Sequence, residues 1–306
     1  MPMSSPAMPQ ETLVTPTPMV RERAGHGFRR WIRTHRKLAA GLTILGLLVL
    51  FSVLGPLFVD TSDAQPMSAF PDLHPSRDYP FGTDDQGRDL LAVAVVGLPL
   101  TLQVGLIAGA VAILIGTILG LTAGYLGGTV DVVIRSIADV LLTVPGLVVL
   151  ITIAASIEGV ISVELMALVV ASLAWMWPTR TIRSQVLSLR ERAYIQMAQL
   201  SGMKTHEIIF FEIMPNLLPY LAASFVGSVS AAILASIGLE ALGLGPQNEP
   251  TLGMTIYWAT TFNAVIRGLW WWLAMPIALI VLTFISLFLI SAGLDEIANP
   301  RLRKES

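Results

Sequence analysis

Six long apolar stretches constrain the fold of this chain more than any other feature. They cover residues 38–59, 98–123, 132–155, 163–177, 217–237 and 269–292. A helix needs roughly 20 residues to cross about 30 Å of hydrocarbon, and most of these stretches reach that length. Because they are continuously apolar rather than alternating, they indicate helices and not the strands of a barrel. We therefore predict an all-α, polytopic membrane protein with six transmembrane helices.

Composition agrees with a membrane protein. The chain is 54% hydrophobic and 13% charged, whereas soluble domains carry about 25% charged residues. It has no cysteine, which excludes a disulfide framework and any thiolate metal or redox site. The first apolar stretch has the basic flank of a signal peptide, but its core is too long and no small-residue cleavage pattern follows it. We interpret it as an uncleaved first helix.

The distribution of Lys and Arg predicts the orientation. Of the 19 such residues, all but Arg77, Arg88 and Arg267 fall on one side of the predicted topology. The positive-inside rule assigns that side, with both termini, to the cytoplasm. The expected organisation is a cytoplasmic tail over 1–37 (disordered over 1–20), a first transmembrane helix over 38–59, an outer loop over 60–97, a core of five transmembrane helices over 98–292 and a cytoplasmic tail over 293–306.

A polar segment, residues 188–216, interrupts the apolar core on the cytoplasmic side. One helix face in it carries residues spaced i, i+3, i+4 and i+7: Tyr194, Met197, Ala198 and Ser201. Gly202 follows, where a helix commonly ends in a left-handed residue. A second short helix is expected over 205–214, before Pro215 and Pro219 mark the entry to the fifth span. From the pattern alone, this segment is either a docking surface for another protein or an interfacial helix resting on lipid headgroups.

The spacing within this segment resembles the E-A-A-x-x-x-G motif of bacterial ABC-importer permeases, which ends in L-P after a fixed gap. Ala198, Gly202 and Pro215 match the motif. Gln196 stands where the motif has Glu, and Met197 where it has the first Ala. The loss of the Glu removes a negative charge from the surface that would meet an ATPase.

Four further blocks, in the same order along the chain, resemble the C-type permease of the dipeptide, oligopeptide and nickel importer family. They read YPFGTDDQGRDLL at 79–91, GLTAGYLGGTVDVVIRSIADVLLTVPGLVVL at 120–150, AAILASIGLEALGLGPQ at 231–247 and GLDEIANPRLR at 293–303. The resemblance covers roughly residues 28 to 303. It departs from the family pattern near the fifth span, where SIGLE replaces EAGLS and QNEPTLG replaces QPPxPSWG.

The resemblance implies a type I ABC-importer permease in a bacterial or archaeal plasma membrane. Such a subunit forms the pathway with a second, unlike permease subunit, above two cytoplasmic ATPase subunits and below an extracytoplasmic substrate-binding protein. ATP and Mg would be bound by the ATPase subunits, and this chain would carry no cofactor, metal or catalytic residue. The absence of a G-x-x-x-x-G-K-[ST] phosphate loop fits that division. Di- or oligopeptides are the implied substrates, with oligosaccharides or nickel as alternatives; nothing points to nucleic acid.

Under this interpretation, the coupling segment supplies the residues that meet the ATPase: Arg190, Glu191, Tyr194, Met197, Ala198, Ser201, Gly202 and Met203. Asp131, Arg135 and Asp139 are spaced i, i+4 and i+8 on one helix face. We interpret them as structural ion pairs, with a proton or ion relay as the alternative.

The outer side offers two further sets of candidates. Asp84, Arg88 and Asp89 form either an internally paired turn or a contact for the binding protein. The candidates for the substrate path are Glu240, Gln247 and Trp270. Hydration at the outer boundary would also account for Glu240, and an aromatic belt at the bilayer interface would account for Trp270.

Two other classes of function are weighed against the permease subunit. A stand-alone ion-coupled carrier should show broken half-helices and charges near mid-membrane, whereas the charges here cluster at the inner ends of the spans. An intramembrane enzyme would need paired catalytic groups within the spans. The sequence shows no such pair.

Overall fold

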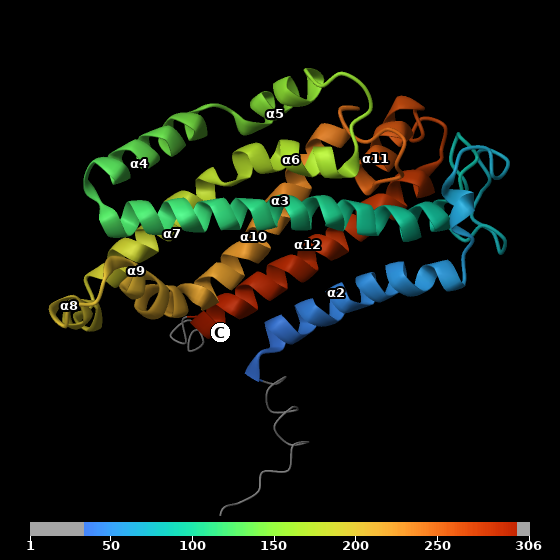
Figure 1. Cartoon of the computed structure of the whole chain (residues 1–306). Coiled ribbons are helices and arrows are strands. Elements are labelled where there is room, and N and C mark those ends of the chain that lie inside the picture. The colour runs from blue at the N-terminus through green and yellow to red at the C-terminus, as the bar shows by residue number, and fades with distance from the viewer. Residues whose placement is uncertain (1–33, 299–306) are drawn as a thin grey trace, which may run out of the picture. The chain divides into compact units, whose positions relative to one another are not determined.

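The computed structural model describes residues 34–298. The expected disorder of residues 1–20 and the basic C-terminal tail lie outside the described residues. The chain divides into two units, residues 1–35 and 36–306. The described part of the second unit is built of helices and loops and contains no β-strand, which confirms the all-α prediction (Figure 1).

Four helical segments are long and apolar enough to cross a bilayer. They comprise α2 (Arg36–Leu54, extended by the short η1 at Gly55–Leu57), α3 (Leu90–Leu126), the continuous run from Thr205 to Glu240 and α12 (Trp270–Ala298). Two further pairs qualify only when each is taken as one bent span. They are α4 (Gly128–Thr143) with α5 (Gly146–Ala155), bent by 83°, and α6 (Val163–Ala174) with α7 (Met176–Arg190), bent by 44°. The predicted six spans are therefore four, or up to six if both bent pairs cross.

The entry to the fifth span differs from the prediction. The helix does not break at Pro215. Instead α9 (Thr205–Glu207), a π-helical turn η3 (Ile208–Ile213) and α10 (Met214–Glu240) follow one another without a gap. Proline lacks an N–H and its ring clashes with the carbonyl four residues earlier in an α-helix. The π-helical turn ends at Ile213, two residues before Pro215, and such turns occur mostly as single-turn bulges within α-helices.

Glycines pack α3 closely against two neighbours at the centre of the unit. A Cβ on Gly105 would lie 2.3 Å from Ile233 of α10, and one on Gly116 would lie 2.5 Å from Pro178 of α7. Gly109, Gly120 and Gly124 make equally close approaches to the same two helices. Small residues spaced by four bring helix backbones together in membranes, where dispersion contacts replace the hydrophobic effect as the driving force.

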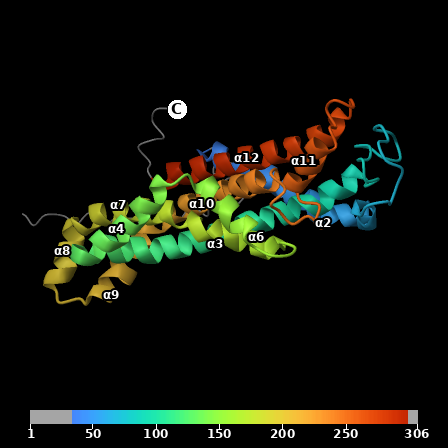
Figure 2. The same ribbon diagram turned by 90° about the horizontal axis from the view of Figure 1, so that it is seen from above.

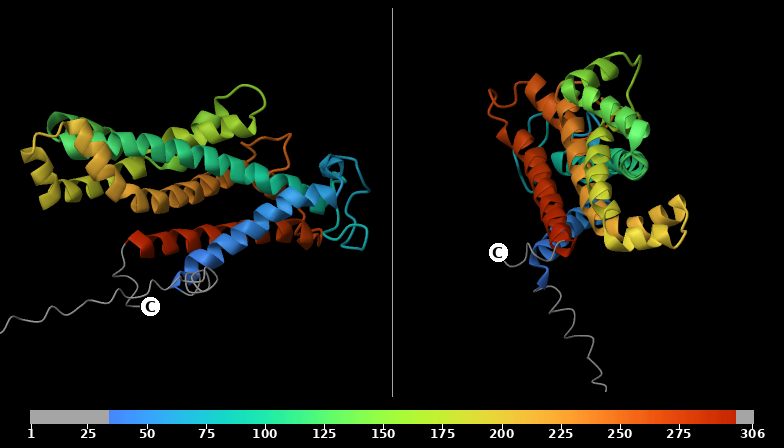
Figure 3. Two further views of the ribbon diagram at one scale, coloured as in Figure 1. Left: turned by 60° about the horizontal axis from the view of Figure 1, so that its bottom comes forward. Right: turned by 90° about the vertical axis from the view of Figure 1, so that its left-hand side faces the viewer.

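The remaining elements cover this centre. Helix α2 lies along α12, and the left view of Figure 3 shows the two helices. Gly41 of α2 and Gly293 of α12 lie at their contact. Helix α4 lies beside α3 and α7, and α5 lies beside α6 and α10; both are seen along the top of Figure 1. A short helix, α11 (Leu252–Thr261), follows the Gly- and Pro-containing segment after α10.

The loop over 60–89 and helix α8 (Ala193–Leu200) lie at opposite ends of the long helices (Figures 1 and 2). The loop contains the short η2 turn (Thr61–Ala64) and leads into α3, which begins at Leu90 rather than at the predicted 98. Asp89 caps this helix, because its side chain accepts a hydrogen bond from the N–H of Leu91 at 3.0 Å. The cap satisfies one of the free N–H groups of the first turn.

Candidate functional site

Helix α8 is the part of the predicted coupling segment that stands clear of the other helices. Its apolar side chains divide into two sets. Ile195 and Ala198 are buried against α7, η3 and α10, whereas Met197 and Leu200 are 62% and 83% exposed. Tyr194 is 38% exposed, and Ser201 also lies at the surface. Neighbouring exposed apolar side chains of this kind mark a contact with either another protein or a membrane.

The end of α8 has the geometry that the sequence predicts. Gly202 has φ of +79°. Its N–H donates to the carbonyl of Gln199 at 3.1 Å, and the N–H of Met203 donates to the carbonyl of Ala198 at 3.2 Å. This pair of bonds is a Schellman motif, which requires a left-handed residue at the glycine position. The bend then leads directly into the helix that becomes α10.

Two contacts connect the coupling segment with the end of α3, one from the last residue of α7 and one from α8. The Arg190 guanidinium lies 3.2 Å from the carbonyl oxygen of Tyr125 and 3.5 Å from that of Gly124, to which it donates. These are carbonyls of the last turn of α3, where a cation is favoured by the helix dipole. Gln199 lies 3.5 Å from the Tyr125 hydroxyl. Arg190, expected at the ATPase contact, is thus partly committed to α3, while Glu191 remains exposed.

The environment of Tyr194 follows from the same packing. Partial burial, together with the nearby Glu212 carboxylate, raises the pKa of the Tyr194 phenol above its ordinary value. The hydroxyl therefore stays neutral at physiological pH and presents a polar but uncharged edge to any partner.

The ion pairs of α4 reach across to α7. Asp131 pairs with Arg183 through both carboxylate oxygens, and these side chains are 17% and 18% exposed. Asp139 lies 3.6 Å from Arg135 and 3.5 Å from Arg180. The expected pairing within one helix face is therefore present for Arg135 and Asp139, whereas Asp131 takes its partner from α7. Bidentate pairing of Arg with a carboxylate fixes the relative orientation of the two helices.

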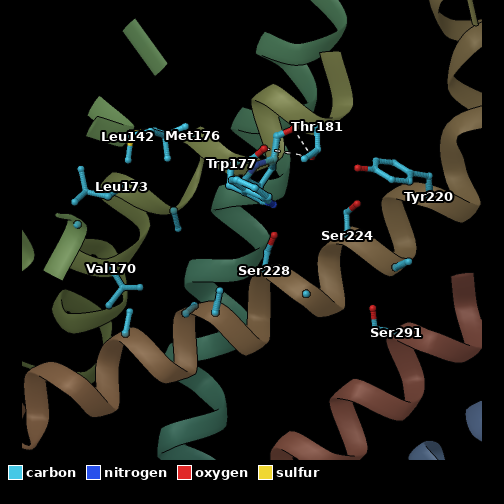
Figure 4. Close-up of a pocket in the computed structure, with 18 of the residues that line it drawn as sticks. Leu142, Val170, Leu173, Met176, Trp177, Thr181, Tyr220, Ser224, Ser228 and Ser291 are labelled. Atoms are coloured by element: carbon cyan, nitrogen blue, oxygen red, sulfur yellow. Dashed lines mark hydrogen bonds between the residues drawn. The ribbon is translucent and has the colours of Figure 1, made fainter. Parts of the chain in front are cut away.

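A cavity of about 550 Å³ opens between α10, α12 and the two bent pairs (Figure 4). Its walls are mainly aliphatic, and hydroxyl groups project into it from three helices: Thr181 of α7, Tyr220, Ser224 and Ser228 of α10, and Ser291 of α12. Residues at both bends line the cavity. They are Leu142 and Gly146 at the bend between α4 and α5, and Met176 and Trp177 at the bend between α6 and α7. Mostly apolar concave walls with a few polar groups are typical of small-molecule sites.

The predicted substrate-path residues do not line this cavity. Glu240 is fully buried and accepts a hydrogen bond of 2.6 Å from the Thr251 hydroxyl, so it joins the end of α10 to the start of α11. The backbone N–H of Leu252 donates to the Thr101 hydroxyl of α3 at 3.0 Å. Gln247 borders a smaller, separate cavity of about 230 Å³, and Trp270 is 66% exposed at the start of α12. Glu240 is therefore shielded from bulk solvent and from the larger cavity in this conformation.

The outer-loop candidates form a buried turn. Arg88 lies 2.6 Å from Asp84, and these side chains are only 6% and 0% exposed. Burial raises the pKa of Asp89, the cap of α3. Arg267, from the loop before α12, pairs with both Asp72 and Asp85. The two carboxylates raise the pKa of the Arg267 guanidinium, and the hydrogen bond to Asp85 makes the larger contribution. The pairing favours the internally paired turn, and it leaves little of Asp84 and Arg88 for a binding protein to contact.

Sequence reasoning missed several residues that the structure brings together. Arg183 and Arg180 complete the ion pairs of α4, and the hydroxyls of Tyr220, Ser224 and Ser228 line the cavity. The spacing of four residues between these hydroxyls was the available signal, because it puts them on one face of an otherwise apolar span. No comparable signal pairs Arg183 with Asp131, since 52 residues separate them.

Comparison with known proteins identifies the family. The family described as "Binding-protein-dependent transport system inner membrane component" matches residues 116–304. The dipeptide transport system permease protein DppC of Bacillus subtilis (strain 168) is 32% identical over 275 residues, which are 90% of this chain and 85% of the relative. The oligopeptide transport system permease protein OppC of the same organism is 30% identical over 277 residues, 89% of this chain and 88% of the relative.

A third relative extends the similarity to another organism. The oligopeptide transport system permease protein OppC of Escherichia coli (strain K12) is 32% identical over 279 residues, which are 90% of each chain. The family match over residues 116–304 includes α8, the bent pairs and the cavity-lining parts of α10 and α12. Together with the apolar helices described above, these matches show that the chain is a multi-pass membrane protein that belongs to the family of permease subunits of binding-protein-dependent transport systems.

Proposed function

We propose that this chain forms one half of the translocation pathway of an ATP-driven importer of di- or oligopeptides. The names of its relatives refer to dipeptides and oligopeptides, which supports peptides ahead of oligosaccharides or nickel. The cavity of about 550 Å³ has the size and the mixed apolar and hydroxyl lining that suit a short peptide in transit.

The proposed partners are a second permease subunit, two ATPase subunits and an extracytoplasmic binding protein. In this assembly the ATPase subunits bind ATP and Mg, and the present chain has no catalytic role. Both termini lie in the cytoplasm, on the same side as α8. Contact with the binding protein falls to the outer loops, although Asp84 and Arg88 act mainly within their own turn.

One observation carries the proposal. Helix α8 exposes Met197 and Leu200 at the surface of the chain, while Ile195 and Ala198 on its other face pack against the helices that lead into the spans. A rigid amphipathic element with this arrangement transfers a push from a docked protein to α7 and α10, which border the cavity. An interfacial helix that only rests on lipid would not need such firm attachment on its other face.

A stand-alone carrier is the alternative that the structure brings back into view, because two spans are bent. Discontinuous helices are a feature of many secondary transporters, which place ion-binding groups at the break. Here the two breaks carry Val144 and Pro145 in one pair and Trp175 in the other, and none is charged. The charges of α4 lie before its break, paired with α7. The permease subunit therefore remains the better account.

The test is a pair of substitutions that each add one negative charge to α8. Met197→Asp puts the charge on the exposed apolar face, and we expect it to reduce both peptide import and transport-coupled ATP hydrolysis at least tenfold in the assembled complex. Gln196→Glu is the matched control, because it restores the residue of the family motif at the adjacent position. We expect it to leave both activities at or above the level of the unmodified complex.

A complex that imports peptide normally with Met197→Asp would overturn the coupling role of α8. Gly202→Trp provides a second variant. It forces a large side chain into a left-handed position that L-residues avoid. We expect it to displace the end of α8 and to uncouple ATP hydrolysis from import, as measured by the ratio of peptide imported to ATP hydrolysed.

A further inference from the structure

One carboxylate stands in a cavity whose other walls are uncharged. Among the residues that line the cavity of about 550 Å³, Asp295 of α12 is the one Asp, Glu, Lys, Arg or His side chain. Ser291, one turn earlier on the same helix, also faces the cavity (Figure 4). The other polar side chains that line it are the five hydroxyl-bearing residues and the indole of Trp177.

The neighbouring residue shows how differently two adjacent acids are used. Glu296 pairs with Lys37 of α2 at 2.6 Å and is 14% exposed. Asp295 is exposed, and no basic side chain of the described residues lies within ion-pair distance of it. The charge of Glu296 is therefore compensated within the fold, and the charge of Asp295 faces the cavity without compensation by the described residues.

An uncompensated charge acts strongly in such a place. Apolar walls of low dielectric focus the field of a charge into the space that they enclose. At about 10 Å and an effective dielectric constant of about 50 to 80, which suits an exposed carboxylate, a unit negative charge favours a cation over an anion by about three- to tenfold. A cation in the cavity is then favoured over an anion, and no described lining residue offsets the difference.

We propose that Asp295 gives the translocation cavity a preference for cationic solutes, so that a peptide with an ammonium or guanidinium side chain passes more readily than one with a carboxylate side chain. Asp295 acts here as a specificity-determining residue of the pathway, in addition to any selection by a binding protein. The proposal rests on the function proposed above, because the cavity must lie on the path of the peptide.

The first test measures the potential in the cavity without requiring transport. Because the chain has no cysteine, Ser224→Cys provides a single thiol in the cavity of this subunit within the assembled complex. We measure its rate of modification by a cationic and by an anionic methanethiosulfonate reagent of similar size. The ratio of the two rates should fall about three- to tenfold when Asp295→Asn is added.

Glu296→Gln is the matched control, since it removes the same charge at the next position, from a side chain that faces α2. We expect this variant to leave the ratio of the two rates unchanged. A ratio that does not change with Asp295→Asn, or that falls equally with Glu296→Gln, would overturn the proposed role of Asp295.

The second test measures import of two peptides that differ only in a Lys or a Glu residue, at saturating concentrations of the loaded binding protein. The Lys-to-Glu ratio of import rates should fall severalfold with Asp295→Asn and recover with Asp295→Glu. If the unmodified complex imports no peptide at all, the proposed function fails, and the labelling ratio alone decides on the charge of the cavity. If it imports both peptides with a ratio insensitive to Asp295→Asn, the specificity proposal fails and the proposed function stands.

Discussion

Two regions of the molecule, the centre around α3 and the arm formed by α4 and α5, are held in place by different forces. In the centre, five glycines of α3 let α7 and α10 approach so closely that a single added Cβ would overlap their atoms. In α4 the only buried residue is Ala138, and the glycines that begin the two helices of the arm, Gly128 and Gly146, have open space around their Cβ positions.

Charge replaces close packing in α4, whereas α5 buries Leu150 and Ala154 in an apolar cluster with α3, α6 and α10. Asp131 and Asp139 connect α4 with Arg183 and Arg180 of α7, and a left-handed pair of glycines, Gly127 and Gly128, joins the arm to α3. A region fixed by ion pairs and a glycine joint can change position at lower cost than one whose packing would have to be rebuilt. We infer that α4 can shift at lower cost than the centre.

The largest effect on thermal stability is expected from adding side-chain volume to the centre around α3. A Cβ on Gly120 would lie 2.9 Å from the Ile182 side chain and from the Thr179 carbonyl. Overpacking of a tight core costs about 1–3 kcal/mol and at times more, so Gly120→Leu should lower the thermal unfolding midpoint of the purified complex by several degrees. Gly46→Leu, on α2 with no atom within 4 Å of its Cβ position, serves as control and should leave the midpoint unchanged.

A smaller effect is expected from removing the ion pair between the arm and α7. Asp131→Asn leaves a largely buried Arg183 without its carboxylate, and hydrogen bonds to charged groups contribute about 1.5–3 kcal/mol. A double-mutant cycle with Arg183→Gln should give a coupling energy in that range when thermal stability is compared. Near-additive losses would show that the pair contributes nothing and that the arm is held by something else.

The smallest effect is expected at the exposed end of the same network. The side chains of Arg135 and Asp139 are 58% and 42% exposed and lie 3.6 Å apart. Exposed pairs contribute about 0–1 kcal/mol because water and salt screen them. Arg135→Ala should therefore change the unfolding midpoint by less than Asp131→Asn does. An equal or greater loss would mean that the arm depends on its outer end rather than on Asp131.

Local patterns predicted the parts of the structure that local forces determine. The apolar stretches marked α2, α3, α10 and α12, and the glycine after α8 adopts the predicted left-handed conformation because no other residue suits a Schellman end. The sequence did not reveal the bends after Thr143 and Ala174, since the apolar runs continue through them. Hydropathy reports how apolar a segment is and not whether its axis is straight.

The candidate site was predictable only in part for the same reason. The position of α8 followed from its polarity and spacing, but the division of its residues into a buried and an exposed face depends on where η3 and α10 pack. That packing buries Ala198, which was expected at the docking surface, and commits Arg190 to the end of α3. The cavity joins side chains from the bent pairs, α10 and α12. No spacing within one segment could have revealed it.

The central claim is that α8 transmits the motion of a docked ATPase to the spans, and a crosslink tests it most directly. A photoreactive amino acid replaces Met197 in the intact complex, and Leu47, which is 60% exposed on α2, carries the same probe as control. The account predicts that the probe at 197 captures an ATPase subunit in high yield, and that the probe at 47 does not. Capture of lipid alone at position 197, in a complex that still hydrolyses ATP and imports its substrate, would contradict it.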